Sequence, residues 1–430
     1  MRRWIWTSLL LLSLAFPSVV GADDPIRVTD QWVESSFRDH ITFSIRVQGD
    51  HPITEARLLY RVAGLPATAR GDVDFEPGAV VEATFTIDQR RDYLPPGAEL
   101  TYWWKITDQA GGTLKTDPQA LQYMDDRRDW ETLENERLAL HWYKGAQSFG
   151  EALFEQANRT LDQIENEAGV YVEKQVRIFI YGSHRDLLDS IAVGAQDWTG
   201  GQAFTEYGVV VLGVSPSDID FGLVATPHEL THIVIHRATD NPYGDLPHWL
   251  DEGLAVYMSG EIDVDWRGYR ELVATRAGQD RLMTLQTLSS SFPADSDMAL
   301  QAYAQSGLVV EFIIKEYGRE TMAHLLEIFS EGTTYDDALL EVLGVDTWGL
   351  DQAWRQTIGA PTLEVPAVGG ETPVVEELAV TATSTPAPAA TPTASEDAEP
   401  IPGGGGLLPC LGSSLASLTA LMMFLFFRAQ

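Results

Sequence analysis

Two stretches of the sequence, TPHELTHIVIHR at residues 226–237 and LPHWLDEGLAVYMSG at residues 246–260, decide how the central part of the chain folds. Apolar side chains of the second stretch fall on one face of a helix: Leu250, Leu254, Tyr257 and Met258. Pro247 suits a first helical turn, and DNPYG at 240–244 supplies turn-forming residues between the stretches. The pattern predicts two helices joined by a short turn.

The first stretch contains His228-Glu229-Leu230-Thr231-His232, an HExxH pattern. Residues four apart share a face of a helix, so the imidazoles of His228 and His232 can converge on one metal ion. Glu229 lies between them, where its carboxylate can reach a water bound to that metal. Four of the nine histidines of the chain lie between residues 228 and 248, which favours a metal site here.

A metal site of this kind needs a third protein ligand. His236 cannot supply it on a continuous helix, because the eight residues from His228 rise about 12 Å, whereas zinc–nitrogen bonds are about 2 Å long. The extended metzincin pattern would place Gly and His where Ile235 and Ala238 stand, so that class is excluded. Glu252, on the second predicted helix, is the better candidate.

This arrangement resembles the gluzincin metallopeptidases, which carry HExxH followed by a Glu on a later helix. The string PHWLDEGLA at 247–255 is especially similar to the peptidase MA-like branch, in which a Pro-x-Trp-Leu-x-Glu-Gly segment supplies that ligand. The resemblance covers roughly residues 130–355. It implies an α+β zincin-like fold, hydrolysis of peptide bonds, one Zn²⁺ ion per chain and three metal ligands: His228, His232 and Glu252.

The same resemblance implies roles for side chains around the metal. Glu229 is the expected general base, which takes a proton from the attacking water and passes it to the leaving amine. Tyr303, in AYAQSG at 302–307 at the opening of another predicted helix, is the candidate donor to the oxyanion, with an ordinary surface aromatic as the alternative. Apart from that resemblance, His248 is expected to be an exposed helix residue, with a contact behind the metal ligands or with substrate as the alternative, and Asp251 is similarly ambiguous.

Thr226 and Pro227 leave open a second interpretation of the first stretch. Thr226-Pro227-His228-Glu229 satisfies the capping-box pattern, so a helix could begin here rather than near Asp220. A Glu229 side chain that capped the helix could not also face a water on the metal. We favour the catalytic role, because the two histidines supply a metal for Glu229 to serve.

Upstream, strands are predicted at 175–181 and 207–213 and helices at 147–168 and 184–192. GGQAF at 200–204 resembles the edge strand over which such enzymes lay an extended substrate.

The Gly-x-Met-Glu-Asn motif with which aminopeptidases bind a substrate amino terminus does not occur in the sequence, which favours an endopeptidase. Val256 stands where thermolysin-like enzymes have an Asp that orients a histidine, so that support must come from elsewhere.

The N-terminal part alternates polar and apolar residues in short segments. Strands are predicted at 40–47, 55–64, 79–87 and 98–108, separated by Gly or Pro turn signals at 49–50, 71–72, 95–97 and 111–112. We expect an all-β immunoglobulin- or fibronectin-like sandwich. Trp103 and Trp104 would face opposite sides of a strand. We favour one core and one domain-interface tryptophan over a carbohydrate- or peptide-binding platform.

The two ends of the sequence predict export and anchoring. Residues 1–22 combine a basic start, an apolar stretch and small residues before a cleavage site, which is typical of a signal peptide. Residues 407–427 are uncharged, and as a helix these 21 residues would span about 31 Å before Arg428. The alternatives are an uncleaved N-terminal anchor and a processed sorting tail. We expect an exported protein held in the cell membrane, with its catalytic domain extracytoplasmic.

The expected organisation is multidomain: signal peptide 1–22, β-sandwich 23–125, gluzincin-like domain 126–358, disordered Pro/Thr/Ala-rich stalk 359–406 and transmembrane helix 407–427. The formal net charge of −34 argues against a nucleic-acid partner. The single cysteine, Cys410, excludes intrachain disulfides, cysteine-ligated zinc ribbons and iron–sulfur clusters. A peptide or protein substrate is expected. The alternatives are a non-hydrolytic cell-surface binding protein with a relict metal site, and a zinc hydrolase of another substrate.

Overall fold

The computed structural model describes residues 25–191, 200–263 and 268–363. The predicted signal peptide, most of the stalk and the predicted transmembrane segment therefore lie outside the described residues. Within the described part of the chain, no helix has the length and apolar character needed to cross a membrane. The chain divides into two compact units between Arg128 and Asp129, and each is described here by itself.

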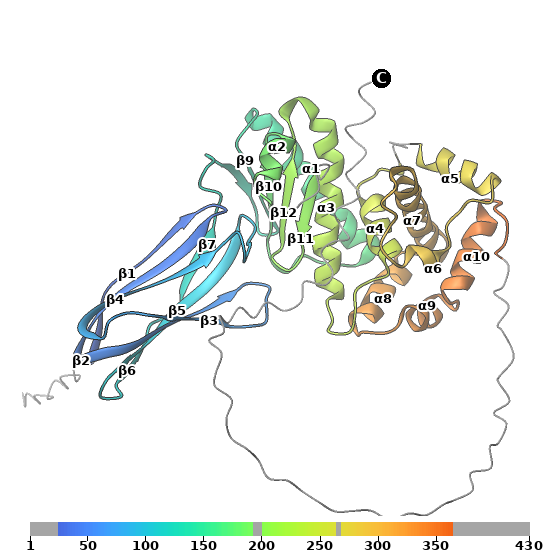
Figure 1. Cartoon of the computed structure of the whole chain (residues 1–430). Coiled ribbons are helices and arrows are strands. Elements are labelled where there is room, and N and C mark those ends of the chain that lie inside the picture. Colours follow the sequence, from blue (N-terminus) through green and yellow to red (C-terminus); the bar gives the residue numbers. More distant parts are fainter. Residues whose placement is uncertain (1–24, 192–199, 264–267, 364–430) are drawn as a thin grey trace, which may run out of the picture. The chain divides into compact units, whose positions relative to one another are not determined.

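The N-terminal unit is built of antiparallel strands, which confirms the prediction of a β-rich region (Figure 1). Its strands are β1 (Ile26–Ser36), β2 (His40–Val62), β3 (Ala69–Val73), β4 (Gly78–Asp88), β5 (Ala98–Asp108), β6 (Thr113–Lys115) and β7 (Gln119–Tyr123). The finer assignment to an immunoglobulin- or fibronectin-like sandwich stays a prediction.

β2 runs without a break through the predicted turn at Gly49-Asp50, so that prediction is wrong. Its first half pairs with β1 and β4 and its second half with β3 and β5, with a shift in register between Gln48 and Ile53. Pairing with β1 continues as far as Gly49 and keeps the backbone extended there.

The predicted turn at Gly71-Asp72 is also wrong, because both residues belong to β3. Gly71 is needed there for space, since a Cβ atom would collide with the Phe85 ring.

Aromatic side chains pack between the first half of β2 and β5. The Phe43 ring on the first half of β2 lies 4.8 Å from the Tyr102 ring on β5, measured between centroids. Trp104 is fully buried, whereas Trp103 points the other way, with the Lys115 ammonium 5.3 Å from its ring centroid. The alternation along β5 therefore places one tryptophan in the core and one at the surface of this unit.

The second unit contains a mixed five-stranded sheet in the order β11-β12-β10-β9-β8. Its strands are β8 (Glu131–Glu134), β9 (Leu138–Trp142), β10 (Val176–Tyr181), β11 (Gly201–Phe204) and β12 (Val209–Gly213). β10 is parallel to β9 and β12, and the outer strands β8 and β11 are antiparallel to their neighbours. β10 and β12 are almost continuously apolar, as expected for strands covered on both faces.

Ten helices follow or cover the sheet in the described residues, together with a short 3-10 turn at Pro216–Asp218. The helices are α1 (Gln147–Ala168), α2 (His184–Leu188), α3 (Ile219–Thr239), α4 (His248–Met258), α5 (Tyr269–Gly278), α6 (Leu285–Leu288), α7 (Ser296–Tyr317), α8 (Arg319–Ser330), α9 (Tyr335–Leu343) and α10 (Thr347–Thr357). α3 packs against β11 and β12 and also against α4, and Figure 1 shows α4 to α10 gathered beyond α3 from the sheet. α7 begins six residues before the predicted opening at 302, because Asp295 caps it.

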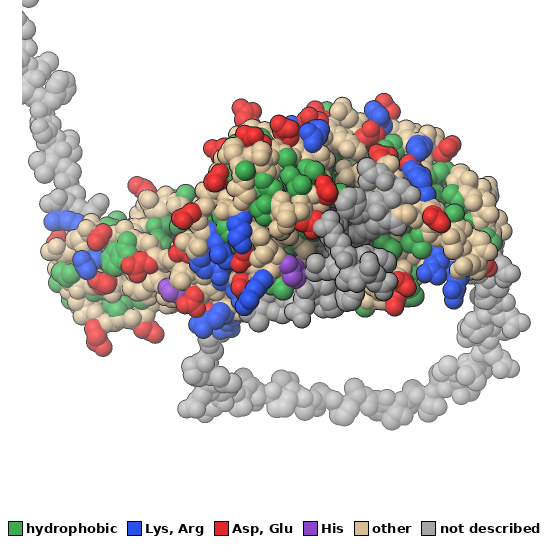
Figure 2. All heavy atoms as spheres, turned by 90° about the horizontal axis from the view of Figure 1, so that it is seen from above, with side chains coloured by type: hydrophobic (Ala, Val, Ile, Leu, Met, Phe, Trp, Pro, Cys, Tyr) green, Lys and Arg blue, Asp and Glu red, His purple; other side chains and the backbone are tan. Residues whose placement is uncertain are grey.

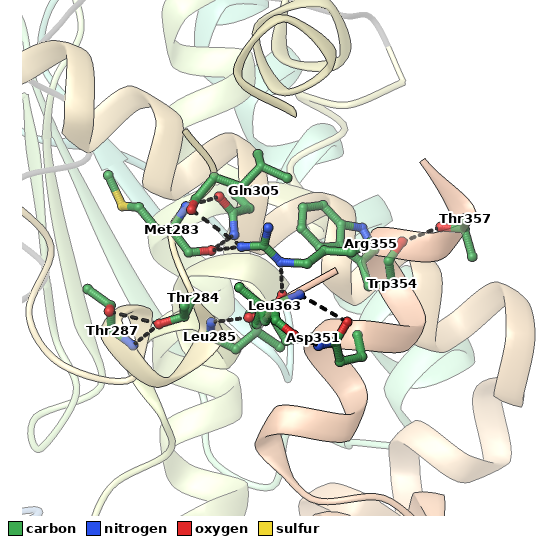
Figure 3. A network of polar contacts seen from close by, with 12 residues as sticks. Met283, Thr284, Leu285, Thr287, Gln305, Asp351, Trp354, Arg355, Thr357 and Leu363 are labelled. Carbon is green, nitrogen blue, oxygen red and sulfur yellow. Dashed lines mark hydrogen bonds and ion pairs between the residues drawn. The ribbon is translucent and has the colours of Figure 1, made fainter. Parts of the chain in front are cut away.

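A buried polar network fixes α10 to α7 through the segment before α6 (Figure 3). Arg355 donates from Nε to Asp351 at 2.8 Å and from Nη2 to the Met283 carbonyl at 3.0 Å. Asp351 accepts the Leu285 amide at 2.9 Å, and the Gln305 amide donates to the Met283 carbonyl at 2.6 Å. Arg355 and Asp351 are each 1% exposed, so this ion pair is part of the core.

Figure 2 shows red acidic side chains dispersed among the other types on the face that it draws. This dispersal accords with the 63 acidic residues set against 29 Lys and Arg in the whole sequence. The expectation that nucleic acid is not a partner stays a prediction.

Candidate metal centre

Helices α3 and α4 carry the residues that the sequence predicts as metal ligands. α3 begins at Ile219, so Thr226 and Pro227 lie inside the helix, and the capping-box interpretation is wrong. Because the helix is continuous through the HExxH pattern, His228 and His232 lie one turn apart on one face. Their ring centroids are 5.1 Å apart.

The side chain of Glu252 on α4 reaches both imidazoles. Its Oε2 atom lies 3.5 Å from Nε2 of His228 and 3.4 Å from Nε2 of His232. One ligand atom from each of the three residues lies within 4.8 Å of the other two. The two histidines are 2% exposed and Glu252 is 0% exposed. The structure therefore brings the predicted triad together in a buried site.

The unpaired polar atoms of this triad fit a metal ion. Nε2 of His228 and both carboxylate oxygens of Glu252 are buried, yet they make no hydrogen bond to any described residue. Leaving such groups unpaired is costly, and a buried carboxylate needs a cation or donors. Two imidazole nitrogens and a carboxylate oxygen are ligands that zinc accepts, so the residues present could bind a metal.

The outer nitrogens of both histidines face carboxylates. Nδ1 of His228 lies 3.2 Å from Glu261, and Nδ1 of His232 lies 3.1 Å from Asp251. An ionised carboxylate only accepts hydrogen bonds, so each Nδ1 carries the proton. Nε2 of each ring faces Glu252 and is the atom left to bind a metal.

Glu261 was not identified from the sequence. It lies beyond the end of α4 and is 5% exposed. Ser259 donates to its Oε1 atom at 3.0 Å, and the Tyr269 hydroxyl donates to Oε2 at 2.7 Å. Together with Asp251 it supplies the support that Val256 cannot give. No spacing in the sequence could have identified it, because its contact with His228 depends on tertiary packing.

The carboxylates of Glu252, Glu261 and Asp251 place negative charge around the two imidazoles. Burial lowers the pKa of His228, but the Glu252 and Glu261 carboxylates outweigh it and raise the value to about 9. Burial likewise opposes the charged form of His232, while Asp251 and Glu252 hold its pKa well above the ordinary value. Burial raises the pKa of Glu252, but the two histidines overcome it and lower the pKa far below the usual range. The site therefore favours a cation at its centre.

Glu229 lies between the triad and the edge strand β11. It is 1% exposed, and a Cβ atom placed on Gly201 would come within 3.4 Å of its Oε1 atom. Its Oε2 atom has no hydrogen-bond partner in the described part of the chain. Burial raises its pKa, although the charges of His228 and His232 oppose the shift. A buried carboxylate with a raised pKa can both accept and return a proton.

Tyr303 is in the core beside the triad. It is 2% exposed, and its ring centroid lies 6.4 Å from that of His228. The alternative of a surface aromatic is therefore wrong. The role of its hydroxyl group as a donor to the oxyanion stays a prediction.

The expected exposure of His248 is also wrong. It is 9% exposed, and its Nε2 atom lies 3.8 Å from Oε1 of Glu252. His236, one turn beyond His232, is half-buried and lies outside the cluster of possible ligands, in agreement with the limit set by helix geometry.

The buried triad agrees with a comparison of the chain with known protein families. Residues 156–360 match the model of the Peptidase MA superfamily. The match includes both stretches from which the metal site was predicted, and it supports an MA-clan metallopeptidase-like domain in the second unit. This MA-like domain contains the complete His228, His232 and Glu252 triad.

Among solved structures, similarity is low. The wild-type OgpA protein from Akkermansia muciniphila in one crystal form is 14% identical, with a TM-score of 0.19, over 26% of this chain and 31% of that chain. A family 56 carbohydrate-binding module, a β-1,3-glucan binding domain, is 15% identical, with a TM-score of 0.16, over 22% of this chain and 96% of that chain. None of the curated proteins matches the sequence. The match to OgpA covers about a third of the length of that protein.

Proposed function

We propose that this chain is a membrane-anchored, extracytoplasmic zinc peptidase of the gluzincin type, which cleaves within peptide chains. The observation that carries the proposal is the convergence of His228, His232 and Glu252, with Glu229 beside them. The match of residues 156–360 to the Peptidase MA superfamily supports a hydrolase of this kind.

His228, His232 and Glu252 would hold one zinc ion. Zinc at this position would supply an acidified water and polarise the substrate carbonyl group. The carboxylates of Glu261 and Asp251 keep the two imidazoles in the tautomer that offers Nε2. These outer contacts support the assignment, because a relict site would have no need of them.

Glu229 would act as the general base and then as the general acid. Its carboxylate is buried, with one unpaired oxygen, and its raised pKa suits transfer of a proton from water to the leaving amine. The Tyr303 hydroxyl would donate a hydrogen bond to the oxyanion of the tetrahedral intermediate. Its burial beside His228 supports this role.

Strand β11 would bind the substrate in extended form. It is the outermost strand of the described sheet and pairs with β12 on one side. A peptide could add to its other side through backbone hydrogen bonds. Because Gly201 lets Glu229 approach β11 closely, a scissile bond laid along this strand would lie next to the proposed base.

Export and anchoring rest on the sequence of residues 1–22 and 407–427. The stalk between the second unit and the membrane would let the domain reach substrates away from the surface. We assign no substrate to the N-terminal unit.

The test uses the full-length chain purified in detergent. Metal content is measured, and a peptide library is digested with and without a chelator. We expect about one zinc per chain and internal cleavages that chelation abolishes. Zinc binding without any cleavage would favour the non-hydrolytic alternative, and a chain that binds no zinc would refute the proposal.

A further inference from the structure

His248 is a buried side chain to which the proposed chemistry gives no task. It is the first residue of α4, one turn before Glu252. Its Nε2 atom is buried and makes no hydrogen bond to any described residue. Because an unpaired buried nitrogen is costly, its presence at this position calls for a partner.

Glu252 presents its two oxygens to different neighbours. Oε2 lies within 3.5 Å of the Nε2 atoms of His228 and His232, whereas Oε1 lies 3.8 Å from Nε2 of His248. His248 is outside the set of residues whose ligand atoms lie within 4.8 Å of one another. It is therefore placed behind the ligand carboxylate and not among the ligands.

Packing holds the His248 ring in this place. Its centroid lies 4.4 Å from that of Phe292 in an edge-to-face arrangement, and Phe292 lies 5.0 Å from Tyr303 in the same way. The His248 backbone amide also donates to the Ser289 carbonyl at 3.3 Å. The ring is thus oriented by its contact with Phe292.

We propose that His248 is a positioning residue for Glu252. With the proton on Nε2, His248 would donate to Oε1 once a small shift shortens the 3.8 Å separation, and Oε2 would stay on the side of His228 and His232. A carboxylate fixed in this way would lose less freedom on binding a metal ion. The inference rests on the proposed metal-dependent function, which it deepens by explaining how the third ligand is held.

The test compares His248→Gln with His248→Met in the full-length protein. The two side chains have nearly the same size, but only Gln can donate a hydrogen bond to Oε1. Zn²⁺ affinity is measured by competition with a chromophoric chelator, and the visible absorption of the Co²⁺-loaded protein reports the ligand geometry. His324→Met serves as the control, because it makes the same substitution at an exposed histidine on α8. His248→Leu replaces the Met variant if that variant does not fold.

We expect His248→Met to raise the Kd for Zn²⁺ by about tenfold or more and to change the Co²⁺ absorption band. His248→Gln and His324→Met should stay within about threefold of the wild type. Wild-type affinity and absorption in His248→Met would overturn the inference, as would an equal loss in the Gln variant. If the wild type binds zinc and cleaves peptides, either of these two results would overturn the role of His248 but not the proposed function. A wild type that binds no zinc would refute the proposed function itself.

Discussion

Nδ1 of His228 lies 3.2 Å from the Glu261 carboxylate, which is held in turn by Ser259 and Tyr269. This contact joins a predicted metal ligand on α3 to the chain segment that leads into α5. It fixes both the tautomer and the orientation of the imidazole. The geometry of the site thus depends on residues well outside the HExxH pattern.

Replacing Glu261 should weaken metal binding. Glu261→Gln removes the negative charge that fixes the proton on Nδ1, so we expect the Kd for Zn²⁺ to rise about 10- to 100-fold. Chelator competition measures the change. Glu320→Gln, an exposed carboxylate on α8, is the matched control and should bind as the wild type does. Equal affinities of the Glu261 and Glu320 variants would contradict the role of Glu261.

Glu229→Gln should separate metal binding from catalysis. The amide keeps the size of the side chain but cannot take a proton, so peptide hydrolysis should fall by about 10²- to 10⁴-fold. Zinc content, measured on the same sample, should stay at the wild-type level. Unchanged turnover would show that another group acts as the base.

Glu252→Ala should lower the zinc content of the purified protein. This change removes the only carboxylate that faces both Nε2 atoms within the described triad. Two imidazoles alone hold zinc weakly, so the ion should be lost on dialysis. Full zinc occupancy after dialysis would exclude Glu252 as a ligand.

His141 should make the protein less stable in acid. It is 8% exposed on β9, its ring stacks on Phe179 at 4.5 Å, and its Nδ1 lies 2.9 Å from the Thr132 hydroxyl. Burial, helped by the charge of Arg177, lowers its pKa from 6.5 to about 4. The unfolded chain binds this proton below about pH 6.5 and the folded protein does not. Stability present above pH 6.5 is therefore lost as the pH falls toward 4, by on the order of 3 kcal/mol in total.

Denaturant unfolding of the chelated protein at pH 7 and pH 4.5 measures this effect. His141→Gln, which does not titrate, should lose less stability over that interval than the wild type. The histidines of the metal site titrate in both proteins, so the difference isolates His141. Identical losses would mean that His141 is protonated in the folded state.

Arg355→Met should destabilise the protein strongly. It leaves the Asp351 carboxylate buried without its cation, at a cost of about 3–5 kcal/mol. The double variant Asp351→Asn/Arg355→Met removes both charges and should recover part of that loss, as measured by the free energy of unfolding. A double variant no more stable than Arg355→Met would show that the charge of Asp351 is not the cause.

The parts of the site set by local periodicity were predictable from the sequence. Helix α1 has the predicted bounds, and the spacing of His228 and His232 on a helix fixes their common face. The position of Glu252 followed from a resemblance, and the structure brings its carboxylate to both imidazoles. The roles of these residues in catalysis remain to be tested by the variants above.

The contacts set by tertiary packing were not predictable. His248 occupies a position on α4 that could equally face solvent, and it is buried because Phe292, more than forty residues later, packs against it. The Gly49-Asp50 pair has the chemistry of a turn, but pairing with β1 keeps it extended. In both cases a partner distant in sequence decides the outcome over local preference.

The three side chains of the triad lie within one stretch of 25 residues, from His228 to Glu252. An ion held there would cross-link two consecutive helices, and the loop that it closes is short. A cross-link that closes a short loop restricts the unfolded chain less than a cross-link between segments distant in sequence. Loss of the ion would therefore destabilise α4 locally and leave the sheet and the remaining helices folded. The domain could then lose and rebind its metal ion without unfolding.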